Sequence, residues 1–539
     1  MNFSISASVL PGAAAISLLA AGSLAWAAGD SPQAIADAGY KAMGMDGVQA
    51  RNVVISGTLR AWDPGESESV SDPYTPDWGN STFTQTIDFM RGSYRGEWVR
   101  PRAGNGMRNY TEIVTSEYDG HPGGYVTGID VNGGQPSRAI GPANAPMHTM
   151  SGKRLTTTLR ELERNDVVEA MHAHPDRVSE IPAQRAGGKT YPAVQYRSDH
   201  GTFIVLFDPA THLPAVVRTR DWDVHTGDAN YDETLSDWRD VGQGVKMPFQ
   251  QLYTINGTKI FEVHLNNVSL NAQVAADAFA APAQLRRKAA APQPVGKVPF
   301  QWVLRRMGNG FYLDSDALYT DDGQNLRLVD AGPNISFVTG GSHNVLIVAS
   351  DHYLTAFEAP GDDGMSNQVI EMAAQKYPGK PFRYVVLTHH HIDHTGGLRA
   401  FSAQGATVVV GKGNGGFFRK ALGAPANLNL YPLKGKPQPK VIEVADKWSV
   451  KDGNREIDAF VLDNPHAKGY LMPYVADAKL GFVTDLWNPG APINQVNPNL
   501  VAVVKGVEKF GIKPERFAGG HGGIGNYADL EKAVNGSGK

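Results

Sequence analysis

The sequence contains no cysteine, and this absence excludes disulfide bonds, thiolate metal ligands and cysteine nucleophiles together. The chain also has no block of basic residues, because its 50 Lys and Arg and 54 Asp and Glu are mixed along it. Proteins that bind nucleic acid need a basic surface, so nucleic acid is not expected as a partner. Any metal ion that binds must be held by histidine and carboxylate side chains.

No Lys or Arg precedes the apolar run in the first 27 residues, so this segment carries only its α-amino charge. The run ends in Ala25-Trp26-Ala27, the small-x-small pattern that a signal peptidase accepts. We therefore expect residues 1–27 to be a signal peptide and the mature protein to be periplasmic or secreted. An uncleaved membrane anchor is the alternative, because the positive charge that usually precedes the apolar run is missing.

The length of 539 residues predicts more than one domain, and the first, residues 30–279, has the pattern of antiparallel strands. Apolar and polar residues alternate in Phe83 to Phe89 and again in Phe261 to Leu265. Turn signals such as Gly187-Gly188 and Asn256-Gly257 separate the apolar runs. Five apolar residues at helical spacing, from Leu155 to Met171, predict one helix that covers the sheet.

This order of strands, helix and further strands is similar to the half-barrel of bacterial lipoprotein carriers. The resemblance is architectural, and no specific motif supports it. It implies a β-rich domain that binds a lipid or another hydrophobic ligand.

Residues 280–297 are rich in Ala and Pro and are expected to form a linker. Beyond it, residues 298–539 change to short, continuously apolar runs that alternate with helical patterns. Val345 to Val348, Tyr384 to Leu387 and Thr407 to Val410 are typical of buried strands, and Asn367 to Tyr377 of a helix. The sequence thus predicts an α/β domain at the C-terminus, preceded by a mainly antiparallel β domain with one covering helix.

Directly after the Tyr384 to Leu387 run comes the segment Thr388-His389-His390-His391-Ile392-Asp393-His394-Thr395-Gly396-Gly397. Histidines packed so densely in a core would each need a hydrogen-bond partner and would repel one another when protonated. A bound dication removes both problems. We therefore expect a metal site in this loop.

The motif His389-x-His391-x-Asp393-His394 after a buried strand resembles the signature of the metallo-β-lactamase superfamily. The resemblance implies an αββα sandwich with two metal ions. It assigns His389 and His391 to site one and Asp393 and His394 to site two. It also implies three further ligands: His466 for site one, Asp485 as the carboxylate that bridges both ions, and His521, flanked by glycines, for site two.

Imidazole and carboxylate ligands suit zinc, so we expect two Zn²⁺ per chain, with manganese or iron as alternatives. Metal coordination brings the pKa of a bound water down to about 7 and polarises the bond to be cleaved. The expected chemistry is hydrolysis by a metal-bridging hydroxide. Asp393 is the catalytic candidate, because the resemblance implies that this carboxylate orients the hydroxide or carries its proton.

Departures from the family pattern narrow the expected substrates. Asp485 favours the ester, lactone and thioesterase-like members over the β-lactamases of the three-histidine type, which generally lack the bridging carboxylate. Asn488 stands where homoserine-lactone lactonases place a tyrosine. Glu358 stands where the fold usually has an Asp that supports a metal ligand, and it takes that role or is a solvated carboxylate.

Three residues near the motifs are not counted as metal ligands. His390 is expected to point away from its neighbours and to pack or form hydrogen bonds. Lys468 is expected to be solvated, with binding of a substrate carboxylate as the alternative. His343 is expected to be a surface residue, with an approach to the metals from the first hairpin of the domain as the alternative. The main hypothesis is thus an exported binuclear hydrolase that acts on a carbonyl bond of a small-molecule substrate with hydrophobic character. The alternatives are a β-lactamase and a peripheral lipid-binding carrier with a non-catalytic metal domain. Oligomeric state is not predicted.

Overall fold

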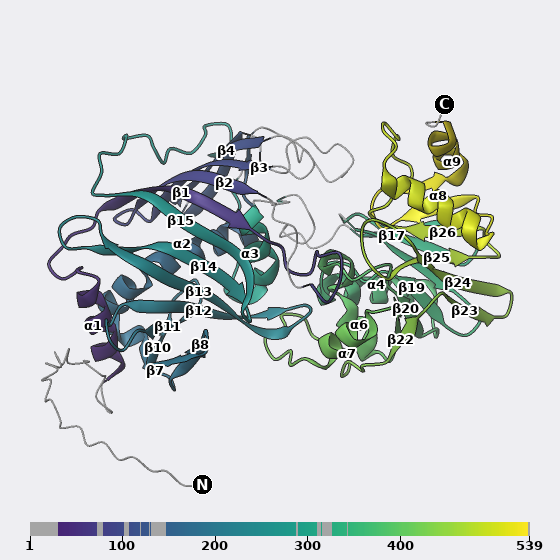
Figure 1. Cartoon of the computed structure of the whole chain (residues 1–539), viewed down its shortest axis with the longest axis horizontal. Coiled ribbons are helices and arrows are strands. Elements are labelled where there is room, and N and C mark those ends of the chain that lie inside the picture. The colour runs from purple at the N-terminus through teal and green to yellow at the C-terminus, as the bar shows by residue number, and fades with distance from the viewer. Residues whose placement is uncertain are drawn as a thin grey trace, which may run out of the picture.

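The computed structural model forms two bodies that lie side by side (Figure 1). An N-terminal domain is built on one large sheet, and a C-terminal sandwich is built on two smaller ones. The signal-peptide prediction falls outside the described residues. The structure describes residues 31–72, 79–101, 107–118, 120–128, 130, 147–286, 289–309, 314, 326–341 and 343–536.

The N-terminal sheet is antiparallel and has the strand order β6-β5-β4-β3-β2-β1-β15-β14-β13-β12-β11-β10-β7. A separate hairpin pairs β8 with β9. The strands are β1 (Asn52–Ala61), β2 (Asn80–Asp88), β3 (Ser93–Pro101), β4 (Met107–Tyr118), β5 (His121–Gly128), β6 (Met147–Thr149), β7 (Val178–Glu180), β8 (Gln184–Ala186), β9 (Lys189–Tyr191), β10 (Ala193–Arg197), β11 (Thr202–Phe207), β12 (Pro214–Asp223), β13 (Gly227–Asp240), β14 (Lys246–Ile255) and β15 (Thr258–Leu270).

Alternating side chains give this sheet one buried face. The odd-numbered residues of β1 from Val53 to Ala61 are buried, whereas the residues between them are partly or fully exposed. Two of the predicted turns close hairpins in which left-handed backbone is required. Asn256 and Gly257 have φ of 47° and 87° between β14 and β15, and Gly187 and Gly188 have φ of 53° and 80° between β8 and β9.

Three helices accompany the sheet: α1 (Pro32–Ala42), α2 (Gly152–Ala173) and α3 (Phe300–Asn309). The predicted covering helix is α2, which begins where the Ser151 side chain accepts a hydrogen bond from Arg154 N–H. Leu155 and Leu159 of α2 and Phe300 and Leu304 of α3 join the core formed by the buried face of the sheet. The fold is therefore the predicted antiparallel β domain with a covering helix, extended by α1 and α3.

The C-terminal sandwich contains a seven-stranded sheet, β16-β17-β18-β19-β20-β21-β22, and a six-stranded sheet, β23-β24-β25-β26-β27-β28. Both mix parallel and antiparallel neighbours. The strands are β16 (Arg327–Gly332), β17 (Ile335–Thr339), β18 (Val345–Ala349), β19 (Leu354–Phe357), β20 (Phe382–Val386), β21 (Thr407–Gly411), β22 (Val441–Val444), β23 (Lys447–Asp452), β24 (Arg455–Leu462), β25 (Tyr470–Val475), β26 (Leu480–Val483), β27 (Arg516–Gly519) and β28 (Ile524–Asn526).

Three apolar cores hold the sandwich in four layers. Helices α4 (Asp363–Lys376), α6 (Leu398–Ala403) and α7 (Gly415–Gly423) pack on the outer face of the seven-stranded sheet. The inner faces of the two sheets pack on each other. Helices α8 (Pro498–Phe510) and α9 (Tyr527–Gly536) cover the outer face of the six-stranded sheet. This is the αββα arrangement, and it explains why β18, β20 and β21 read as continuous apolar runs: both faces of their sheet are covered.

Helix α3 falls in the predicted C-terminal domain by sequence, but it packs mainly on the N-terminal domain. It lies within residues 298–539, yet it packs mainly on α2, β1, β12 and β15 of the N-terminal domain, and its Trp302 also packs with Ile392 of the sandwich. The reason is its apolar face, because Phe300 and Leu304 enter the N-terminal core. The predicted linker also packs on this domain, where Ala281 and Leu285 meet Ile113. Among the described residues, no helix is long and apolar enough to cross a membrane.

Candidate metal centre

All seven predicted metal ligands lie at one edge of the sandwich, where strands end. His389 and His391 follow β20, and Asp393 and His394 lie in the short helix α5 (Ile392–Thr395). His466 lies between β24 and β25, Asp485 just after β26, and His521 between β27 and β28. Both sheets thus contribute residues, and the packing of the two sheets brings their strand ends together.

The first group consists of His389, His391, His466 and Asp485, which each offer a ligand atom within 4.8 Å of the others. The Nε2 atoms of His389 and His466 are 3.2 Å apart. Two ligands of a tetrahedral zinc ion, each at about 2.0–2.1 Å from the metal, lie about 3.3 Å from each other. The spacing of these imidazoles therefore fits a shared ion.

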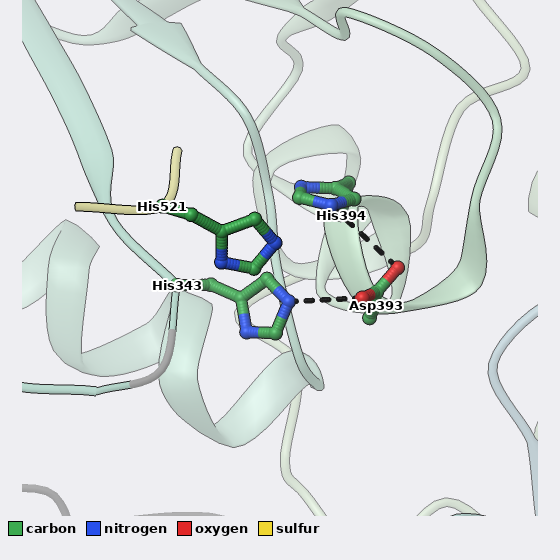
Figure 2. A group of neighbouring side chains, drawn as sticks. All are labelled: His343, Asp393, His394 and His521. Carbon is green, nitrogen blue, oxygen red and sulfur yellow. Dashed lines mark hydrogen bonds and ion pairs between the residues drawn. The ribbon is translucent and has the colours of Figure 1, made fainter. Parts of the chain in front are cut away.

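The second group consists of His343, Asp393, His394 and His521, whose ligand atoms also lie within 4.8 Å of one another (Figure 2). His343 Nε2 is 3.0 Å from Asp393 Oδ2. A carboxylate only accepts hydrogen bonds, so the His343 ring is the donor in this contact. His343 is 6% exposed, so the expectation of a surface residue is wrong; the turn between β17 and β18 carries it into the centre.

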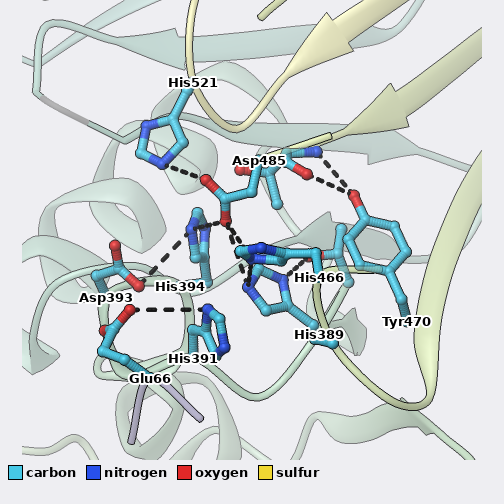
Figure 3. A network of polar contacts seen from close by, with 12 residues as sticks. Glu66, His389, His391, Asp393, His394, His466, Tyr470, Asp485 and His521 are labelled. Carbon is cyan, nitrogen blue, oxygen red and sulfur yellow. Dashed lines mark hydrogen bonds and ion pairs between the residues drawn. The ribbon is translucent and has the colours of Figure 1, made fainter. Parts of the chain in front are cut away.

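Asp485 lies between the two groups (Figure 3). Its Oδ2 is 2.8 Å from His394 Nε2 and 3.3 Å from His389 Nε2, and its Oδ1 is 3.0 Å from His521 Nε2. Asp485 also has a φ of 59°, which costs a non-glycine residue about 1–3 kcal/mol. The surrounding fold thus holds this carboxylate in a strained backbone position that faces both groups.

The pKa of His394 is shifted in the opposite direction to those of His343, His389 and His391. Burial lowers the pKa of His389 well below its usual value, and burial together with His466 lowers the pKa of His391 to about 4. Burial also disfavours the charged form of His394, but Asp393 and Asp485 outweigh it and raise the pKa of this imidazole well above its usual value. The carboxylates around His394 therefore favour a positive charge at this position, as a bound cation would supply.

Glu358 supports the second group. It is fully buried, its Oε2 is 2.8 Å from His394 Nδ1, and its Oε1 accepts a hydrogen bond of 2.7 Å from Thr388 N–H. The contact fixes the ring so that His394 Nε2 faces Asp485, as carboxylates behind metal-binding histidines do. Glu358 was predicted either to support a metal ligand or to be a solvated carboxylate. Its burial and its contact with His394 favour the supporting role.

We predict that Glu358→Gln lowers the affinity of the second group for zinc by about 10- to 100-fold, because glutamine has one acceptor oxygen for the two N–H donors of Thr388 and His394. Zinc titration against a competing chelator measures this change. Glu371→Gln is the matched control, because Glu371 is a 57% exposed carboxylate that pairs with Lys434. Equal zinc affinity in Glu358→Gln and the wild type would contradict the supporting role.

The remaining residues near the motifs lie outside both groups. His390 is 1% exposed and packs beside His391, with ring centroids 5.0 Å apart. The Lys468 ammonium is 3.5 Å from Glu68, and its side chain is 68% exposed. Neither side chain is among the residues that converge on the centre.

The N-terminal domain also reaches the metal centre, and no sequence signal pointed to this. Ser67 C=O is 2.9 Å from His391 Nε2, and Glu66 Oε2 is 3.7 Å from His391 Nδ1. His225 Nε2 is 2.7 Å from the Thr395 hydroxyl. These contacts join residues that are far apart in the sequence, and short polar loops such as residues 63–68 carry no motif.

A third cluster, of Asp130, His148 and Asp314, has the geometry of metal ligands as well. Arg154 lies inside it and contacts both carboxylates. Burial disfavours charge on His148, but hydrogen bonds to Asp130 and Asp314 raise its pKa to about 9. Arg154 and His148 both pair with these carboxylates, so this cluster is an ion-pair network that ties residue 314 to the N-terminal domain.

Comparison with known proteins agrees with this geometry. The model of the Metallo-beta-lactamase superfamily matches residues 321–495, which hold six of the seven predicted ligands. The C-terminal region has a metallo-β-lactamase fold. The match covers less than half of the chain, and His521 lies beyond it. No curated protein matches the sequence.

Solved structures with which the metallo-β-lactamase domain aligns come from varied organisms. A metallo-beta-lactamase from Pontibacter korlensis is 16% identical, with 39% of this chain and 98% of that chain covered and a TM-score of 0.30. A superfamily protein from Sulfolobus tokodaii is 18% identical (40% and 87% covered, TM-score 0.27). Rubredoxin oxygen:oxidoreductase from Desulfovibrio gigas is 14% identical (39% and 61% covered, TM-score 0.31).

Proposed function

We propose that this protein is an exported, binuclear metal-dependent hydrolase that cleaves an ester, lactone, amide or related carbonyl bond of a small molecule. The observation that carries the proposal is the convergence of two ligand groups around Asp485. Histidine and carboxylate donors at this spacing fit two zinc ions, which would supply Lewis acidity and an activated water at neutral pH.

In this proposal each residue has a distinct task. His389, His391 and His466 hold the first ion, and His394 and His521 hold the second together with Asp393. Asp485 contacts both groups and fixes their separation. His343 donates to Asp393 Oδ2, which leaves Asp393 Oδ1 as the atom that would hold the second ion and orient the attacking water.

A substrate-sized cleft opens beside these residues. Its volume is about 1040 Å³, and both Asp485 and His521 line it. Pockets for small organic ligands measure about 300–1000 Å³, so a substrate of that size fits. Trp487 and Ile493 supply apolar surface along the cleft, and Arg327 also lines it. A substrate with hydrophobic character and a carbonyl bond near Asp485 would match this lining.

The N-terminal domain offers less support for a carrier function. The cavity between its sheet and α2 has a volume of about 110 Å³, lined by residues that include Phe83, Trp98 and Leu162. Pockets for small organic ligands measure about 300–1000 Å³, so this cavity is smaller than a typical ligand pocket. A lipid chain would need α2 to move away from the sheet. The hydrolase is therefore the better proposal.

The test uses the purified full chain, loaded with zinc, and a panel of p-nitrophenyl esters, lactones, nitrocefin and bis-p-nitrophenyl phosphate. The proposal expects turnover of esters or lactones that disappears with a chelator and in the double variant His389→Ala, His391→Ala. Preferred cleavage of nitrocefin would replace the proposal by a β-lactamase. A zinc-loaded protein that turns over none of the panel would contradict the hydrolase.

A further inference from the structure

The loop of residues 63–68 in the N-terminal domain docks on the segments that carry two of the metal ligands. Ile392 N–H donates to Gly65 C=O at 3.1 Å, and Lys468 N–H donates to Glu68 C=O at 2.8 Å. These two contacts connect the loop to the segments of His391 and His466. The metal centre thus has a wall that comes from the other domain.

Buried contacts hold this loop in place. Arg305 of α3 is 3% exposed, donates to Pro64 C=O and pairs with Asp223. Gly65 has a φ of 97°, and a Cβ at this position would come within 3.2 Å of the Ile392 side chain. Glycine is therefore required for this close approach.

The docked loop determines which nitrogen of His391 faces a metal. Ser67 C=O is a pure acceptor, so His391 Nε2 must donate to it and His391 Nδ1 keeps the lone pair. Glu66 Oε2 lies 3.7 Å from this Nδ1, on the side of the ring that faces the metal centre (Figure 3). Glu66 is not one of the four residues of the first group, so its carboxylate faces the centre without completing the ligand set.

We propose that Glu66 is a specificity-determining residue, supplied by the N-terminal domain, that disfavours substrates with an anionic group near the first ion. This inference rests on the proposed hydrolase. Two dications would outweigh the three carboxylates Asp393, Asp485 and Glu358, so the centre would keep a positive charge that attracts anions. The Glu66 carboxylate, 3.7 Å from His391 Nδ1 and 18% exposed, reduces that attraction beside the first group, because partial burial weakens solvent screening.

The experiment compares two esters with the same leaving group: p-nitrophenyl acetate, which is neutral, and p-nitrophenyl hemisuccinate, which is anionic. Glu66→Gln in the zinc-loaded full chain is expected to raise the ratio of kcat/KM for the anionic over the neutral ester by about 10-fold or more. Glu68→Gln is the matched control, because the Glu68 side chain is 66% exposed and pairs with Lys468. The control should keep the wild-type ratio.

A binding measurement distinguishes the loss of the Glu66 charge from a change of structure in Glu66→Gln. Calorimetric titration with phenylacetate and with the neutral phenylacetamide should show that Glu66→Gln tightens the anion about 10-fold and leaves the amide unchanged. Metal content should equal that of the wild type. Unchanged ratios in a zinc-loaded Glu66→Gln would overturn the role of Glu66. Absence of turnover in the wild type would instead count against the hydrolase, and the calorimetric comparison would still test Glu66.

Discussion

Asp485→Asn is expected to lower the zinc content from two ions to at most one per chain, and kcat/KM by about 1000-fold or more. The reason is the position of this carboxylate, which contacts His394 and His389 through Oδ2 and His521 through Oδ1. An amide keeps the size of the side chain but removes the charge and one acceptor. Elemental analysis after gel filtration and steady-state kinetics measure the two effects.

Asp330→Asn is the matched control for this variant. Asp330 is 74% exposed and pairs with Lys376 on the surface, so its replacement should leave metal content and turnover unchanged. Circular dichroism of both variants checks that they fold. A folded Asp485→Asn that keeps two zinc ions and wild-type turnover would show that the two groups do not depend on a shared carboxylate.

Arg305→Met is expected to lower the free energy of unfolding by about 3–5 kcal/mol, because it leaves the fully buried Asp223 without its cation. Methionine retains most of the apolar stem, so the loss reflects charge more than packing. The same change removes the hydrogen bond to Pro64 C=O that holds the loop of residues 63–68. Hydrolysis should therefore fall together with stability.

The loss of stability in Arg305→Met should be larger at neutral pH than at acidic pH. Burial favours the neutral form of Asp223, but Arg305 outweighs it and lowers the pKa of Asp223 to about 2. The wild type therefore gains stability from this pair above the unfolded pKa of about 3.9, and loses it as the pH falls toward 2. Without Arg305, burial makes the same carboxylate costly at neutral pH. Urea denaturation should show a larger deficit at pH 7.5 than at pH 4.5.

The double variant Arg305→Met, Asp223→Asn tests whether the pair is responsible. The double variant removes the unpaired carboxylate at position 223, so part of the lost stability should return. Equal unfolding free energies for the single and double variants would contradict a dominant role for the unpaired carboxylate.

The metal centre shows which parts of a site can be predicted from sequence. His389, His391, Asp393 and His394 are close in sequence and follow a buried strand, so a local motif was enough to group them. His466, Asp485 and His521 were placed through the family resemblance, and the sandwich brings them to the same edge. The burial of His343 in the centre does not follow from its sequence, because a single histidine in a glycine-rich turn does not reveal which way the turn faces.

The contribution of the N-terminal domain could not be predicted. The Ser67 carbonyl reaches His391 across 324 positions, and a backbone acceptor leaves no mark in the sequence. Glu66 looks like any acidic loop residue until the domains dock. The packing of helix α3 could not be predicted either. Its apolar residues predict that it is buried, but they do not show that it packs on the N-terminal sheet. The alternation of apolar and polar residues predicted an antiparallel sheet with one buried face. Its strand order could not be predicted, because it depends on pairings between distant segments, such as β1 with β15.

Anomalous X-ray diffraction at the zinc absorption edge, on crystals of the zinc-loaded full chain, tests directly whether each of the two groups binds a metal ion. We expect two anomalous peaks. One should lie among His389, His391 and His466, the other among Asp393, His394 and His521, and Asp485 should lie between the peaks. A single peak, or no peak at this edge of the sandwich, would contradict the binuclear centre.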